Sequence, residues 1–206
     1  MGRTVTVTGR GRATAPYDQA TLRLAVSARA ANPSDATARA TYAMSAMREA
    51  VLSGGVEVSA LATTAVSLNP VHDPWPTVVG YEASLGLSVR LDDLGRVGSL
   101  LVSAIDAGGD GARVDGIAFG HRDAAALERE ARDAAYADAL DKATQYAGLA
   151  GLALGPVRHV VEGDVGDGSA PHLRLAASHA RDVPVDGGEG VVTALVTVSW
   201  ALGPSV

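Results

Sequence analysis

The segment from Arg122 to Ala150 constrains the fold most, because it is the longest run of the chain without glycine or proline before Gly148. Alanine recurs in it at every fourth position, and four-residue spacing places side chains on one face of a helix. The segment is therefore predicted to be a long helix with a seam of small side chains, which lets its backbone lie close to a sheet. The seam consists of Ala131, Ala135, Ala139, Ala143 and Ala147.

The only lysine of the chain, Lys142, also lies in this segment. A single lysine is a candidate catalytic amine. However, Asp138 precedes it by four residues, and this order of charges on a helix favours an ion pair. We interpret Lys142 as the partner of Asp138 on the helix surface.

Alternation of apolar and polar residues predicts long strands with one buried face. The clearest are residues 19–30, 78–91 and 190–202, and shorter ones are expected at 4–9, 56–70, 112–120 and 156–162. Two more helices are predicted at 33–52, capped by Asn32, and at 92–108, capped by Asp92 or Asp93. Glycine inside a strand pattern indicates a bulge or turn, which we expect at Gly9–Arg12 and at Gly116.

These elements predict an α+β fold in which antiparallel sheets with long strands pack against three helices. A strand–helix–strand pattern occurs at residues 19–69 and again at 78–120, which suggests an internal duplication. We expect one domain over residues 1–206, with intertwined sub-units at 19–77 and 78–206.

Composition limits the classes of partner. A net charge of −6 argues against nucleic-acid binding, because few cations are available to neutralise phosphates. The absence of cysteine excludes disulfides, thiolate catalysis and cysteine–zinc sites. No apolar run is long enough for a transmembrane segment. The start of the chain carries no signal-peptide pattern, so a cytoplasmic location is expected for the chain as it stands, and an exported or periplasmic one if a signal precedes it.

No arrangement of residues predicts chemistry. The spacing of the five histidines does not match a zinc site, although His172 and His179 with Asp182 form a weak candidate for metal chelation. Nucleophile-elbow, zincin and phosphate-loop motifs are all missing. We therefore predict no catalytic, cofactor-binding or metal-binding residue, and no enzymatic activity.

Two loops are the places to look for function. Residues 71–77 contain Trp75 between two prolines, where it is either an interaction anchor or a lid over the sheet. His72 and Tyr81 are further candidate interaction residues. The stretch 163–190 is long and rich in glycine, aspartate, proline and alanine, which is typical of mobile or functional loops.

The order of several segments resembles the SIMPL-domain family, a bacterial family of unknown function that includes periplasmic and outer-membrane immunogenic proteins. The resemblance covers about residues 5–202. It is carried by VTVTGRGRATAPYDQATLRLAV, SLNPVH, GYEASLGLSVRLDDLGRVGSLL and ARDAAYADALDKATQYAGLAGLALG, followed by the last valine-rich strand. The chain departs from the family in having His72 where an aromatic residue is common and in showing no export signal.

The resemblance implies an α+β fold, and for some members ring- or channel-like homo-oligomers, export, and links to envelope integrity or stress tolerance. It implies no catalytic residues. Our leading hypothesis is a non-enzymatic, self-associating protein with a role in stress or in the envelope. Two alternatives stay open, which are a small-molecule-binding or hydrolytic domain with a cleft under residues 163–190, and a subunit of a ring- or channel-like assembly.

Overall fold

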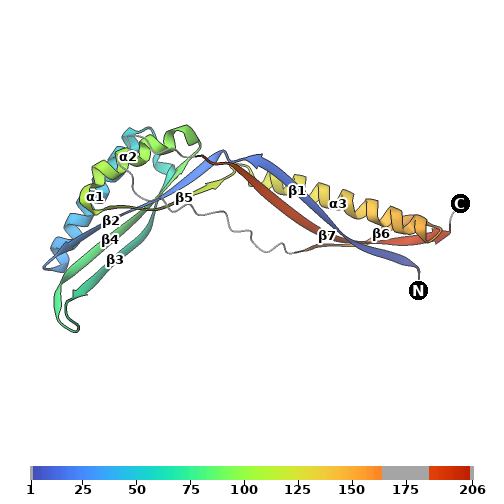
Figure 1. The fold of residues 1–206 in the computed structure, drawn as a ribbon, viewed down its shortest axis with the longest axis horizontal. Helices are drawn as coiled ribbons and strands as arrows, with labels where there is room; N and C mark the ends of the chain where they lie inside the picture. Colours follow the sequence, from blue (N-terminus) through green and yellow to red (C-terminus); the bar gives the residue numbers. More distant parts are fainter. Residues whose placement is uncertain (1, 164–185, 205–206) are drawn as a thin grey trace. The chain divides into compact units, whose positions relative to one another are not determined.

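The computed structural model describes residues 2–163 and 186–204, which contain the three helices and seven strands of Figure 1. The predicted α+β class is confirmed. In chain order the elements are β1 (Thr4–Pro16), β2 (Gln19–Ala30), α1 (Pro33–Ser53), β3 (Leu61–His72), β4 (Val78–Leu91), α2 (Val97–Gly108), β5 (Ala112–Gly120), α3 (Ala124–Leu149), β6 (Leu152–Gly163) and β7 (Glu189–Pro204).

Contacts divide the described residues into two compact units. Unit 1 comprises residues 2–16, 123–163 and 188–204, and unit 2 comprises residues 17–122 with 186–187. These bounds differ from the sub-units at 19–77 and 78–206. The prediction of one domain over the whole chain stays a prediction.

Unit 2 is a four-stranded antiparallel sheet with the strand order β3-β4-β2-β5, against which α1 and α2 pack. The two predicted strand–helix–strand patterns are β2-α1-β3 and β4-α2-β5, and one strand of the other pattern lies between the two strands of each. This is the split βαβ arrangement. Its core is aliphatic, and its largest fully buried side chains include Leu22, Leu24, Met47 and Leu101.

Local signals explain most element ends in unit 2. The side chain of Asn32 accepts a hydrogen bond from the N–H of Asp35 at 2.8 Å, which caps α1 as predicted. The predicted bulge in β5 is also present, because the register with β2 shifts next to Gly116, which has φ 147°. Strand β3 and helix α2 begin later in the chain than predicted, because a short 3₁₀ turn precedes each of them.

Unit 1 is a three-stranded antiparallel sheet with the strand order β1-β7-β6. Strands β1 and β7 come from opposite ends of the chain and pair along their whole length. Helix α3 packs on this sheet, and its five buried residues are the predicted seam of alanines. The seam contacts Ala13, Val196, Val198 and Trp200 of the sheet.

The prediction of a bulge or turn at Gly9–Arg12 is wrong. These residues continue β1 in unbroken register with β7. An added Cβ would lie 2.0 Å from the Ala135 carbonyl oxygen at Gly9, and 2.0 Å from that of Ala131 at Gly11. Glycine is needed here because the backbone of α3 rests directly on the strand.

We therefore expect Gly11→Ala to lower the free energy of unfolding of unit 1 by about 1–3 kcal/mol, the usual cost of overpacking a close contact. Chemical denaturation followed by circular dichroism measures this change. Gly203→Ala in β7 is the matched control, because an added Cβ there has no neighbour within 4 Å, and we expect it to stay within about 0.5 kcal/mol of the parent. Equal stabilities of the two variants would contradict this account of the contact.

Candidate interaction surfaces

The β3–β4 hairpin is the most exposed apolar part of unit 2. Strand β3 is an edge strand, and nearly all its residues are exposed. The side chain of Val66 is 74% exposed, and Leu68 is also exposed. Because α1 packs over β2 and β4, these side chains of the neighbouring β3 stay uncovered in this unit.

The tip of this hairpin brings two of the three predicted interaction residues together. The ring of Trp75 lies 4.4 Å from that of His72, and Trp75 is 77% exposed. Tyr81 is not part of this tip. It is half-buried and packs against Ala83 of β4 and against Ala36 and Ala40 near the start of α1. Exposed Val78 and Val79 follow the tip, so the exposed apolar surface continues into β4.

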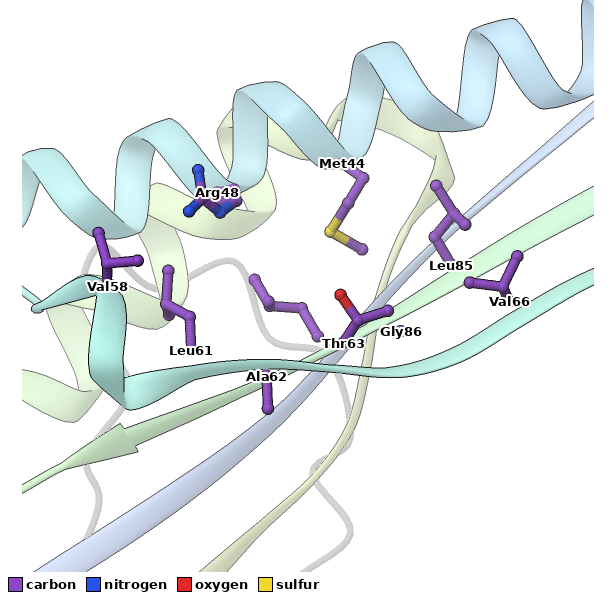
Figure 2. A pocket seen from close by; sticks show the side chains of 10 residues that line it. Met44, Arg48, Val58, Leu61, Ala62, Thr63, Val66, Leu85 and Gly86 are labelled. Atoms are coloured by element: carbon purple, nitrogen blue, oxygen red, sulfur yellow. The ribbon is translucent and has the colours of Figure 1, made fainter.

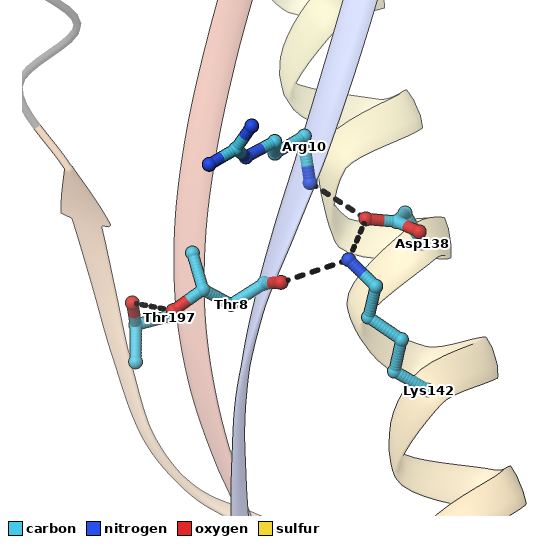
Figure 3. A network of polar contacts seen from close by, with 5 residues as sticks. All are labelled: Thr8, Arg10, Asp138, Lys142 and Thr197. Carbon is cyan, nitrogen blue, oxygen red and sulfur yellow. Dashed lines mark hydrogen bonds and ion pairs between the residues drawn. The ribbon is translucent and has the colours of Figure 1, made fainter.

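The outer edge of β1 is covered by two side chains of α3 (Figure 3). The carboxylate of Asp138 accepts a hydrogen bond from the backbone N–H of Arg10 at 2.7 Å. The ammonium of Lys142 donates to the Thr8 carbonyl at 3.0 Å and contacts Asp138 at 2.6 Å. The predicted ion pair is confirmed, and its contact with the strand edge is a role that the sequence analysis missed.

This network sets the ionisation of Asp138. The hydrogen bond from Lys142 and then the N–H of Arg10 hold the pKa of the Asp138 carboxyl below its ordinary value of 3.8. Both side chains of the ion pair are more than a third exposed, so solvent screens the interaction. The network therefore contributes little energy, but it occupies backbone groups that another strand would need.

The other two sheet edges carry interruptions and charges. Along β6 the register with β7 shifts twice, and the strand contains one proline, Pro156, and the charged residues Arg158 and Glu162. Along β5 the register shifts beside Gly116, and Arg113 pairs with Asp115 at 3.9 Å. Bulges, proline and charges are the usual means by which proteins keep edge strands from pairing.

Strand β3 differs from these three edges. Residues 61–71 include no charged side chain. Between the register shift next to Thr64 and Pro70, Ala65–Asn69 pair with β4 without interruption. Exposed Val66 and Leu68 lie in this stretch. Of the four sheet edges in the described residues, β3 is the one whose edge is both uncharged and apolar.

A pocket of about 390 Å³ lies between α1 and the β3–β4 strands of unit 2 (Figure 2). Apolar side chains from both strands and from the helix form its walls, and Arg48 is the one charged residue among the described residues that line it. A shallower groove of about 730 Å³ runs along β1 beside Lys142 and Tyr146 in unit 1.

A further polar cluster lies where β2 begins and β5 ends. The carboxylate of Asp18 accepts hydrogen bonds from the backbone N–H of Arg122 at 2.8 Å and from its Nε at 3.0 Å. These bonds lower the pKa of Asp18, and the side-chain bond raises the pKa of Arg122. His121 stacks on Tyr17 at 4.8 Å, and its Nε2 is buried without a hydrogen-bond partner among the described residues.

The described residues include no group of three or more histidines, aspartates or glutamates arranged to hold a metal ion. The candidate chelators His172, His179 and Asp182 lie outside the described residues, as does most of the stretch 163–190 under which a cleft was expected. The prediction that the chain has no catalytic, cofactor or metal site stays a prediction.

Comparison with known proteins supports the resemblance drawn from the sequence. Residues 5–200 match the family model SIMPL, described as "Protein of unknown function (DUF541)". Two relatives are called "26 kDa periplasmic immunogenic protein", one from Brucella melitensis biotype 1 and one from Brucella abortus strain S19. Each is 30% identical over 216 residues, which cover 96% of this chain and 84% of the relative.

The expectation of a cytoplasmic location is wrong, because both relatives are described as periplasmic, which points to export. That expectation relied on the first residues of the chain, which belong to β1 from Thr4 onward. None of the helices in the described part of the chain has the length and hydrophobicity to cross a membrane.

The ionisation of Asp138 makes a pH-dependent prediction. A carboxyl whose pKa is lower in the folded chain contributes stability above its unfolded pKa and loses it as the pH falls through the folded value. We expect Asp138→Asn to destabilise unit 1 by about 1 kcal/mol or less at pH 7. This difference is expected to stay nearly constant down to about pH 4, close to the ordinary pKa of aspartate, and to disappear as the pH falls through the lower folded pKa of Asp138.

Urea unfolding at several pH values measures this difference. Asp141→Asn is the matched control, because Asp141 is exposed on the same helix and has no hydrogen bond or ion pair with the described residues. A difference between Asp138→Asn and the parent that did not shrink as the pH fell below about 4 would contradict the assignment to the Asp138 charge.

Proposed function

Because the chain belongs to the SIMPL family, a family of unknown function, we propose that it is a non-enzymatic protein that associates with copies of itself outside the cytoplasm. The observation that supports self-association most is the difference between the sheet edges. The other three edges carry charged side chains or are covered by them, whereas β3, which also has two register shifts and Pro70, presents the uncharged and uninterrupted stretch Ala65–Asn69.

Pairing of β3 with β3 of a second copy satisfies the free backbone groups of both edges. Two identical antiparallel strands pair about a two-fold axis, so this contact alone produces a dimer. Exposed Leu68 and Val66 then lie near their counterparts, and the apolar area that they bury adds about 25 cal/mol per Å².

Trp75 supplies a second contact in this proposal. Large aromatic side chains dominate many protein interfaces, and the ring of His72 contacts that of Trp75 in a tilted arrangement, with an interplanar angle of 48°. A second contact, distinct from the two-fold one, is what a ring- or channel-like assembly requires. We assign Trp75 and His72 to that contact.

The names of the relatives support a periplasmic site of action. A role in envelope integrity or stress tolerance agrees with that location. Association through β-strand edges needs no disulfide, which fits a chain without cysteine.

We expect the protein to have a mass above that of the 20.8 kDa chain in light scattering at micromolar concentration, and Leu68→Lys to raise the dissociation constant at least about tenfold. The lysine places like charges near each other across the two-fold axis and blocks the apolar edge.

Val161→Lys is the matched control, because Val161 on β6 and Leu68 on β3 are both 45% exposed. We expect it to keep the parent mass. A parent that is a monomer throughout the micromolar range would refute self-association, whereas equal effects of the two lysines would refute only the role of the β3 edge.

Trp75→Ala tests the second contact. We expect it to leave dimers intact and to remove larger assemblies, because a central aromatic anchor is worth about 2 kcal/mol or more. Trp200, the other tryptophan, is buried in unit 1, so a blue shift of emission with rising concentration reports on Trp75. The absence of any shift while large assemblies form would exclude Trp75 from the contact.

A further inference from the structure

The pocket in Figure 2 has the size of a ligand site. Its volume of about 390 Å³ falls within the range of roughly 300–1,000 Å³ that is typical of small-molecule sites. It lies on the face of the sheet between the flank of α1, which contributes Met44 and Arg48, and strands β3 and β4. Nothing in the comparisons assigns a role to it.

The walls of the pocket select an aliphatic ligand. Met44, Leu61 and Leu85 are half-buried and pack against the core of unit 2, so the floor of the pocket is continuous with a close-packed interior. None of the described lining residues is aromatic, so they offer no stacking surface for a base or an aromatic ring. The methionine is flexible and adapts to an unbranched chain.

Polar groups on the walls are few. Thr63 supplies a hydroxyl that Figure 2 shows on the side facing α1. The lining contributed by residues 2–163 and 186–204 contains no aspartate, glutamate, asparagine or glutamine. A sugar or polyol would lose its hydrogen bonds to water without replacing them, which costs free energy for each unpaired group.

The charge of Arg48 determines which polar group of a ligand the pocket favours. Arg48 is exposed on α1, and its guanidinium has no hydrogen bond or ion pair with any of the described residues. A guanidinium binds a carboxylate through two parallel hydrogen bonds. Among the described residues, no carboxylate lines the pocket to compete for this guanidinium.

From these features we propose that the pocket between α1 and β3–β4 binds an unbranched aliphatic monocarboxylate, with its chain against Met44, Leu61 and Leu85 and its carboxylate on Arg48. This site lies on the face of the sheet, whereas the proposed pairing of β3 uses the edge. Val66 lies in the pairing stretch and also lines the pocket, but Leu68, which tests the pairing, is not part of the pocket lining. The two proposals are therefore tested by different residues.

Calorimetric titration of the full chain with sodium decanoate, below the concentration at which it forms micelles, tests the site. We expect saturable binding with one site per chain. Arg48→Gln is expected to weaken decanoate binding at least about tenfold, because a charge-assisted pair is lost, and to leave the binding of 1-decanol unchanged. Arg48→Lys keeps the charge and is expected to recover part of the affinity.

Two further variants complete the test. Arg39→Gln removes an equal charge from an exposed position on the same helix, outside the pocket, and is expected to bind as the parent does. Met44→Trp fills the pocket and is expected to lose both decanoate and decanol, with its circular dichroism spectrum showing that it folds. The proposal is overturned if the parent shows no saturable binding, if Arg48→Gln and Arg39→Gln weaken it equally, or if Met44→Trp binds as the parent does.

Discussion

The close contact between α3 and β1 is the interaction on which unit 1 depends. Alanine on the helix and glycine on the strand together remove the side chains that normally separate these elements, so that the carbonyls of Ala131 and Ala135 lie against the strand backbone. The short distance between α3 and β1 brings Asp138 and Lys142 within reach of the outer edge of β1. A helix held farther away by larger side chains would leave that edge open. One packing choice thus buries the sheet face and also covers its edge.

The two units treat their edges differently, and this difference is the basis of the functional proposal. In unit 1, a weak and solvent-screened ion pair occupies β1, while interruptions and charges protect β6. In unit 2, β5 has the bulge beside Gly116 and the ion pair between Arg113 and Asp115. Strand β3 also has two register shifts and Pro70, but residues 61–71 carry no charge, and the stretch Ala65–Asn69 between these interruptions pairs continuously and exposes Val66 and Leu68. The backbone hydrogen bonds of a paired edge have similar geometry whatever the side chains are. Which edge pairs is therefore decided by local features such as charges, bulges and prolines.

The sequence predicted the elements well where one local pattern determined them. The alternation in 78–91, the cap at Asn32 and the alanine seam of α3 each identified an element correctly. Prediction failed where the cause is distant in the chain. Gly9 and Gly11 are explained by Ala131 and Ala135, more than a hundred residues away, and no local rule separates a glycine in a bulge from one beneath a helix. The pocket also required the structure, because Met44, Leu61 and Leu85 show no pattern along the sequence.

The pairing of β1 with β7 has a consequence for the order in which the chain folds. Unit 1 is built from three separated segments, and its central strand is the last to be synthesised or translocated. Residues 17–122 form nearly all of unit 2 as one continuous segment, whose contacts can close early. Contacts between distant residues form slowly. Until β7 is added, β1 and β6 have no strand between them to pair with, and the alanine face of α3 lacks the strand that supplies Val196, Val198 and Trp200 to its core.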